Sequence, residues 1–157
     1  MTGDWEIAPL RSGDEALVRF LVARLTPQSR YRRFRSSSPM PSAEVVSHLA
    51  RPDGWHHIAL VAYTPGVREP IGLGEVFRDA AFDDGEAAIL VVDGWQGRGV
   101  GAALLAGLVD AGRGVGLRRL HGEFLAEHRA VRRLLVRGTV GTRFIPDAGT
   151  TTFEAAI

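Results

Sequence analysis

Hydrophobic residues follow a helical spacing in the first third of the chain. Over residues 13–25 they recur every three or four positions, which is the period of a helix that buries one face. Thr26 before Pro27, and Ser42 before the next apolar segment, are residue types that begin helices. The elements predicted here are a strand at residues 5–10 and helices at residues 13–25, from Pro27 onward, and from Ser42 to Leu49.

Three apolar runs in the middle of the chain predict strands. The turn-forming segments Pro65-Gly66 and Asp83-Asp84-Gly85 separate them, and short connections of this kind join antiparallel neighbours. We therefore predict an antiparallel meander. Its strands occupy residues 57–64, 70–78 and 86–92.

After residue 92 the pattern changes, and helices alternate with strands. The glycine-rich segment at residues 94–101 runs directly into a helix with apolar residues at helical spacing. It is followed by a strand at residues 118–124, a helix at 127–137 and strands at 140–145 and 150–157. The order β-α-α-α-β-β-β-α-β-α-β-β predicts one α+β domain over residues 1–157, in which helices flank a mixed, mostly antiparallel sheet.

Composition narrows the chemistry that the chain can perform. The chain of 157 residues is 45% hydrophobic and 24% charged, with a formal net charge of +1, which is typical of a soluble globule. It contains no cysteine, lysine or asparagine, so all 19 basic residues are arginines. Thiolate chemistry, a phosphate-binding lysine and a Schiff-base lysine are therefore excluded. With no basic N-terminal region and no long apolar run, we expect a cytoplasmic protein without membrane or nucleic-acid partners.

The histidine and serine residues match no metal or nucleophile motif. His56 and His57 are adjacent, so on a strand they would face opposite ways, and the other histidines have no carboxylate at a zinc-binding spacing. The motif Gly-x-Ser-x-Gly is absent. We therefore expect neither a metal cofactor nor serine-hydrolase chemistry.

The glycine-rich turn is the strongest indication of a ligand site. Gly97, Gly99 and Gly101 remove three side chains at the point where a helix begins. The first N–H groups of a helix have no partner within it, and the helix dipole places partial positive charge there. These features favour a bound phosphate or pyrophosphate over a turn that serves packing alone.

Two cofactors are compatible with that turn. The segment from Gly97 to Ala102 satisfies the dinucleotide pattern G-x-G-x-x-A, and Glu123 lies near the end of the next strand, where a ribose-binding acid would be expected. However, too few residues follow Glu123 to complete a doubly wound sheet, and the strands before the turn are joined as hairpins. A dinucleotide is therefore the weaker interpretation.

The segment from Val91 to Gly101 resembles the acyl-CoA loop of the GNAT superfamily of N-acetyltransferases. Gln96, Gly99 and Gly101 match the core pattern Gln/Arg-x-x-Gly-x-Gly/Ala. The predicted order of elements is also similar to the GNAT fold, which has this loop between its fourth strand and the following helix. Within the superfamily, residues 25–34 and 57–62 resemble the catalytic domain of bacterial Pat-type protein lysine acetyltransferases.

The resemblance implies acetyl-CoA as a co-substrate. The pantetheine arm of coenzyme A would lie beside Val91 and Val92, as an added strand would. The implied reaction transfers acetyl to a primary amine, with a protein lysine as the leading acceptor and a small-molecule amine as the alternative. The pyrophosphate would rest on the backbone N–H groups of Gln96, Gly97, Arg98, Gly99, Val100, Gly101 and Ala102.

The resemblance also assigns an acid–base residue and shows two departures from the family pattern. The catalytic glutamate of the family corresponds to Glu86, with Glu75 and Glu123 as alternatives. His128 stands where many relatives have an asparagine that contacts the pantetheine arm, and no tyrosine occurs at residues 134–137, where many have a general acid. A catalytically weak acyl-CoA-binding sensor therefore stays open as a rival interpretation, and a homodimer is an open alternative to a monomer.

Overall fold

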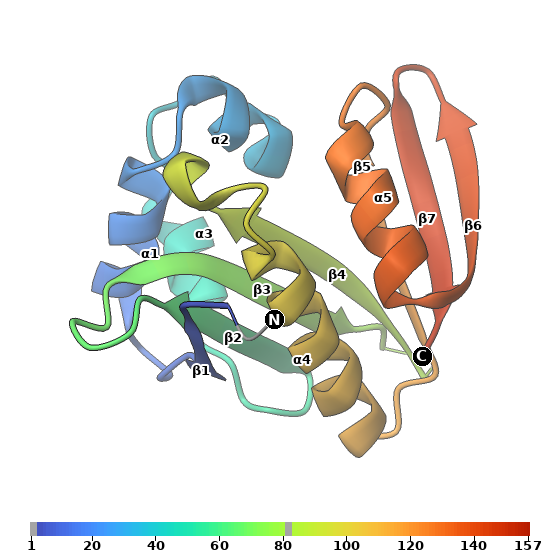
Figure 1. The fold of residues 1–157 in the computed structure, drawn as a ribbon, viewed down its shortest axis with the longest axis horizontal. Helices are drawn as coiled ribbons and strands as arrows, with labels where there is room; N and C mark the ends of the chain where they lie inside the picture. The colour runs from blue at the N-terminus through green and yellow to red at the C-terminus, as the bar shows by residue number, and fades with distance from the viewer. Residues whose placement is uncertain (1–2, 81–82) are drawn as a thin grey trace.

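A computed structural model of the chain describes residues 3–80 and 83–157 (Figure 1). Helices α1, α2 and α3 are clustered in the first third of the chain, and α4 and α5 alternate with strands in the last third. The strands are β1 (Glu6–Pro9), β2 (His57–Tyr63), β3 (Pro70–Arg78), β4 (Asp84–Val91), β5 (Arg119–Leu125), β6 (Val140–Asp147) and β7 (Thr150–Ala156). The helices are α1 (Glu15–Ala23), α2 (Pro27–Phe34), α3 (Ala43–Leu49), α4 (Val100–Gly114) and α5 (Arg129–Gly138).

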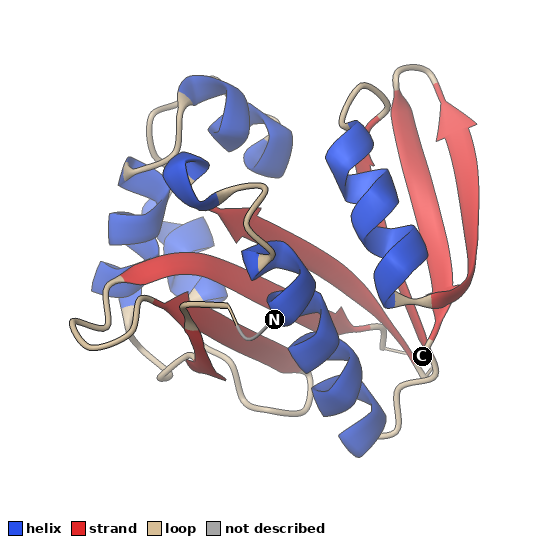
Figure 2. Cartoon of the chain, viewed as in Figure 1, coloured by secondary structure: helices blue, strands red, loops and turns tan. Residues whose placement is uncertain are grey.

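The described strands form one seven-stranded sheet in the order β1-β2-β3-β4-β5-β7-β6. Neighbouring strands are antiparallel except for the pair β4–β5, which is parallel. Helices α1–α3 lie on one face of the sheet, and α4 and α5 lie on the other (Figures 1 and 2). The predicted α+β class, the order of the elements and the mixed, mostly antiparallel sheet are confirmed.

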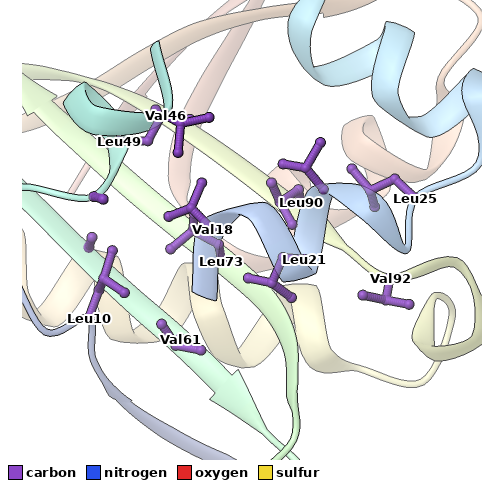
Figure 3. Close-up of a cluster of buried hydrophobic side chains, with 13 residues drawn as sticks. Leu10, Val18, Leu21, Leu25, Val46, Leu49, Val61, Leu73, Leu90 and Val92 are labelled. Carbon is purple, nitrogen blue, oxygen red and sulfur yellow. The ribbon is translucent and has the colours of Figure 1, made fainter. Parts of the chain in front are cut away.

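Each face of the sheet buries its own set of apolar side chains. On the first face, Val18 and Leu21 of α1 pack against strand residues such as Leu73 (Figure 3). On the opposite face, α4 lies close to β3 because two strand positions are glycines. A Cβ atom at Gly72 would lie 3.1 Å from Leu104 Cδ1, and one at Gly74 would lie 3.0 Å from Leu108 Cδ1. The missing side chains therefore set the distance between helix and sheet, and small-to-large changes there would overpack the core.

The parallel pair β4–β5 opens after three residues. Asp84–Glu86 pairs with Arg119–His121, and beyond this point β4 stays paired with β3 while β5 stays paired with β7. The two strands diverge toward the end where β4 meets the glycine-rich segment (Figure 1). This divergence leaves the edge of β4 free to bind another extended chain.

Most element boundaries differ from the sequence-based expectation by one or two residues, and three differences have a clear local cause or consequence. The predicted turn at residues 83–85 is wrong in part, because Asp84 and Gly85 are paired residues of β4. The first helix begins at Glu15, since the Asp14 side chain accepts a hydrogen bond from the Leu17 N–H group and caps the helix there. A 3₁₀ turn at Asp93–Trp95, which the sequence did not predict, follows shortly after β4.

None of the described helices has both the length and the apolarity needed to cross a membrane.

Candidate functional site

The glycine-rich turn joins β4 to α4 and leaves the start of that helix open. Gly97 and Gly99 have φ angles of +72° and +93°, in the left-handed region that glycine adopts without strain. Gly99 is the N-cap of α4 and offers no side chain to the helix. The first bond along the helix runs from the Ala103 N–H group to the Gly99 carbonyl, at 3.0 Å. The N–H groups of residues 100–102 have no acceptor among the described residues, so they can bind an anion.

The glycines of the turn have different surroundings. A Cβ atom at Gly99 would lie 3.2 Å from the Trp5 ring, in a backbone conformation that L side chains rarely adopt. Gly101 has no such restriction, since it lies inside α4 and a Cβ there would meet Leu134 at an ordinary 3.6 Å. Arg98 lies beside the turn, with its guanidinium carbon 5.0 Å from the centre of the Trp95 ring. Gly99 is therefore required by the local backbone, and Gly101 is not.

The free edge of β4 presents backbone groups to the space between β4 and β5. The Val92 N–H group donates to the Ile71 carbonyl at 2.9 Å, and bonding residues alternate along an antiparallel ladder. Ile89 and Val91 therefore direct their N–H and C=O groups away from β3. The Val91 carbonyl already accepts a hydrogen bond from Gln96 Nε2 at 2.9 Å. This leaves the Val91 N–H group and both backbone groups of Ile89 for a ligand.

His128 lies at the N-cap of α5 and is partly buried. Burial lowers the pKa of its ring, and the nearby positive charges of Arg32 and Arg35 lower it further, while Glu127 acts in the opposite direction. At neutral pH the ring is therefore uncharged, with one nitrogen as donor and the other as acceptor.

The three candidate acid–base glutamates lie on the α1–α3 face of the sheet but have different partners. Glu75 is buried, with Oε1 2.9 Å from His57 Nε2 and Oε2 3.1 Å from Arg33 Nη2. Glu123 is largely exposed, with Oε1 3.9 Å from Arg35 Nη2. Glu86 is exposed and makes no ion pair or side-chain hydrogen bond with any other described residue. Of the three, Glu86 is the exposed carboxylate without a described ion-pair partner.

Sequence reasoning missed a side-chain network beneath the glycine-rich turn. Asp93 Oδ1 accepts a bond from the Thr26 N–H group at 2.9 Å, and Asp93 Oδ2 accepts bonds from Thr26 Oγ1 at 3.0 Å and Ser29 Oγ at 2.8 Å. Gln96 Nε2 lies 3.3 Å from the same Ser29 hydroxyl. The Thr26 cap was visible in the sequence, but its partner Asp93 is 67 residues away, and no local pattern joins the two.

In the part of the chain that the structure describes, no group of three or more His, Asp or Glu side chains is arranged to hold a metal ion.

Comparison with known proteins defines the class of this protein. The family model described as Acetyltransferase (GNAT) family matches residues 23–139, and the chain belongs to this family. It is accordingly an acetyltransferase that uses acyl-CoA and an acceptor amine. The expected GNAT fold is confirmed, and the glycine-rich segment lies between β4 and α4 as predicted.

Two relatives and two solved structures narrow the comparison. An acetyltransferase of Pseudomonas aeruginosa is 31% identical over 140 residues, covering 87% of this chain and 75% of the relative. The acetyltransferase Pat of Mycolicibacterium smegmatis is 30% identical over 151 residues, covering 90% of this chain, which spans only 43% of that relative. The GNAT domain of S. lividans PAT superimposes with a TM-score of 0.86 at 24% identity, over 96% of this chain and 89% of that domain.

The second solved structure was determined with bound ligands. Spermidine N-acetyltransferase from Vibrio cholerae, in complex with CoA and spermine, has a TM-score of 0.72 at 14% identity, over 98% of this chain and 95% of that chain. At this identity the likeness concerns the fold alone.

Proposed function

We propose that this protein transfers acetyl from acetyl-CoA to the side-chain amine of a protein lysine. The observation that carries the proposal is the junction of β4 and α4, where a free strand edge leads into an open helix N-terminus. This combination suits a ligand with an extended polar arm that ends in a pyrophosphate. The Pat relatives support lysine as the acceptor, and a small-molecule amine is the alternative.

The residues of the turn and of β4 would hold the co-substrate. The pyrophosphate would accept hydrogen bonds from backbone N–H groups of residues 97–102, because the Gln96 N–H group, expected to take part, already donates to the Asp93 carbonyl at 3.2 Å. The pantetheine arm would run along Val91 and Ile89 beside Val92. His128, on the other side of the opening between β4 and β5, would contact the same arm through its neutral ring. Gln96 already occupies the Val91 carbonyl, whereas the Ile89 N–H group points away from β3 and would donate to the acetyl carbonyl, which stabilises the oxyanion.

Glu86 would remove the proton from the attacking amine. It lies about 10–13 Å along the strand from Ile89 and Leu90, at about 3.3 Å per residue, so the proton would pass through one or two ordered waters. The amine nitrogen bonds to the thioester carbon, the carbon–sulfur bond breaks, and coenzyme A leaves as a thiolate. A thiol with a pKa of about 8.5 leaves without a strong general acid, which fits the absence of tyrosine at residues 134–137.

Release of free coenzyme A tests this proposal against a binding-only role. The protein is incubated with acetyl-CoA and a mixture of lysine-containing peptides, with polyamines in a parallel reaction. A transferase releases thiol only when an acceptor is added, and the peptides should be the better acceptors. Tight binding of acetyl-CoA without thiol release in either reaction would contradict the proposed activity.

A further inference from the structure

Helix α2 is attached to the rest of the molecule at both ends by carboxylates. At its C-terminal end, Arg33 Nη2 lies 3.1 Å from Oε2 of the buried Glu75 on β3. At its N-terminal end, Asp93 accepts one hydrogen bond from the backbone of Thr26 and two from the hydroxyl groups of Thr26 and Ser29. Since Asp93 immediately precedes the glycine-rich turn, the second attachment joins α2 to the proposed cofactor site.

The N-terminal attachment continues into the cofactor site itself. The Ser29 hydroxyl donates to Asp93 Oδ2 at 2.8 Å and lies 3.3 Å from Gln96 Nε2. Gln96 Nε2 also donates to the Val91 carbonyl at 2.9 Å. A chain of hydrogen bonds therefore runs from the first turn of α2 through Ser29 and Gln96 to the last residue of β4. The backbone N–H group of the same Gln96 donates to the Asp93 carbonyl at 3.2 Å, so Gln96 fixes the start of the turn whose following N–H groups form the proposed pyrophosphate site.

The position of α2 gives this connection a role in the reaction. The helix contacts both β4 and β5 and lies beside the end of the sheet where these strands diverge (Figure 1). Arg32 of α2, and Arg35 directly after its end, are close enough to His128 for their charges to act on its ring. Helix α2 therefore borders the opening through which an acceptor amine would reach the thioester.

We propose that Asp93 is a positioning residue that couples binding of acetyl-CoA at the glycine-rich turn to the placement of α2 beside the acceptor site. The inference rests on the proposed function, because it requires coenzyme A to bind at residues 97–102. When the pyrophosphate fixes the turn, Asp93 and Gln96 become fixed as well, and their bonds to Thr26 and Ser29 hold α2. Coupling of this kind is reciprocal, so loosening α2 must also weaken coenzyme A binding.

Two substitutions of Asp93 and its partner test the coupling. Asp93→Asn keeps the size of the side chain but replaces one acceptor oxygen by an NH₂ group, which cannot accept from the Thr26 or Ser29 donors. Ser29→Ala removes the hydroxyl that bridges Asp93 and Gln96 and leaves both carboxyl oxygens in place. Asp14→Asn is the matched control, because Asp14 caps α1 through the Leu17 N–H group and has no bond to the turn.

The measurement is hydrogen–deuterium exchange of the whole chain with and without coenzyme A, together with calorimetric affinity for coenzyme A. Wild type and Asp14→Asn should both show slower exchange at residues 94–102 and at α2 when coenzyme A is present. In Asp93→Asn and Ser29→Ala, protection of the turn should persist while the added protection of α2 is lost, and Kd should rise about threefold to tenfold. A residue that only stabilised α2 would change its exchange equally with and without ligand.

The outcomes separate this inference from the proposed function. If wild type fails to bind coenzyme A, the proposed cofactor site is wrong. If coenzyme A binds and protects the turn, but α2 gains equal protection in wild type and in both variants, the site stands and the coupling through Asp93 is overturned. Should Asp93→Asn fail to fold, Ser29→Ala alone decides between these outcomes.

Discussion

Glu75, Glu86 and Glu123 occupy one face of the sheet, yet their neighbours give them different roles. Glu75 has a side chain only 1% exposed, between Arg33 and His57, so both of its oxygens are already committed to holding α2 and β2. Glu123 Oε1 lies 3.9 Å from the guanidinium nitrogen Nη2 of Arg35. Only Glu86 combines exposure with freedom from described ion-pair partners, which a carboxylate that exchanges protons with water requires.

Replacing Glu86 by glutamine should lower turnover and leave acetyl-CoA binding intact. The substitution preserves shape and removes the basic group, and a positioned base contributes about 10²–10⁴-fold, with a water relay at the lower end of that range. The deficit should shrink as pH rises toward the lysine pKa of about 10.4, because more acceptor is then already deprotonated. The measurement is kcat/KM against pH.

The control for this experiment is Asp110→Asn, which neutralises a carboxylate that is 81% exposed on α4. It should match wild type across the pH range. Equal activity of Glu86→Gln and wild type near neutral pH would remove Glu86 from the mechanism.

His128 should contribute to both cofactor affinity and pH-dependent stability. His128→Asn keeps a donor and an acceptor, so Kd for acetyl-CoA should change by less than about tenfold, or ~1.4 kcal/mol, whereas His128→Ala should weaken binding more. Titration calorimetry with the three proteins measures this order. If neither variant differs from wild type, the ring does not contact the pantetheine arm.

The lowered pKa of His128 sets the sign of the pH effect. Below about pH 6.5 the unfolded chain takes up a proton at this residue more readily than the folded chain does. The contribution of the neutral ring to the stability of the folded protein is therefore fully present above that pH. It is lost as the pH falls toward the pKa that His128 has in the folded protein. Between about pH 7.5 and pH 5.5, the free energy of unfolding by urea should therefore fall more for wild type than for His128→Asn. A difference between the two proteins that does not depend on pH would contradict this expectation.

At the scale of elements, the β4–turn–α4 unit carries most of what the sequence could predict. The period of the apolar residues and the alternate glycines place a strand, an open turn and a helix in the right order, because each is determined by residues close in the sequence. The caps Thr26 and Ser42 were predicted for the same reason and are observed. Long-range partners were not predictable, since nothing near Asp93 indicates Thr26, and nothing near Glu75 indicates Arg33.

Gly99 and Gly101 should respond differently to alanine. Gly99→Ala places a Cβ in a left-handed backbone and 3.2 Å from Trp5, so it should cost about 1–2 kcal/mol of stability and reduce the rise in Tm that acetyl-CoA produces. Gly101→Ala has ordinary contacts and should retain both stability and the ligand-induced shift, whereas Gly101→Val should block the cofactor. Thermal unfolding with and without acetyl-CoA measures each case.

NAD and Gly114→Ala serve as controls for these glycine variants. Gly114 ends α4 with no atom within 4 Å of an added Cβ, and its substitution should leave the ligand response unchanged. A larger shift with NAD than with acetyl-CoA would instead support the dinucleotide interpretation of the turn.

At the scale of the whole molecule, the proposed binding mode would place the two substrates on opposite faces of the sheet. Helices α4 and α5 flank the turn and β5 on one face, where the co-substrate would bind. Helices α1–α3 and the three glutamates occupy the other face, from which the acceptor would approach. The opening between β4 and β5 is where the two sides meet, and it begins where the pairing of β4 with β5 stops after three residues.

The most direct test of the central claim is mass-spectrometric detection of acetylated lysine after incubation of the protein with acetyl-CoA and a lysine-containing peptide library. The chain contains no lysine, so acetylation of its own lysine side chains cannot contribute to the product. We expect acetyl-lysine peptides that accumulate with time, depend on acetyl-CoA and fall sharply with Glu86→Gln. If acetyl-CoA is bound and no acetylated lysine forms above the enzyme-free control, the account of this chain as a protein lysine acetyltransferase is contradicted.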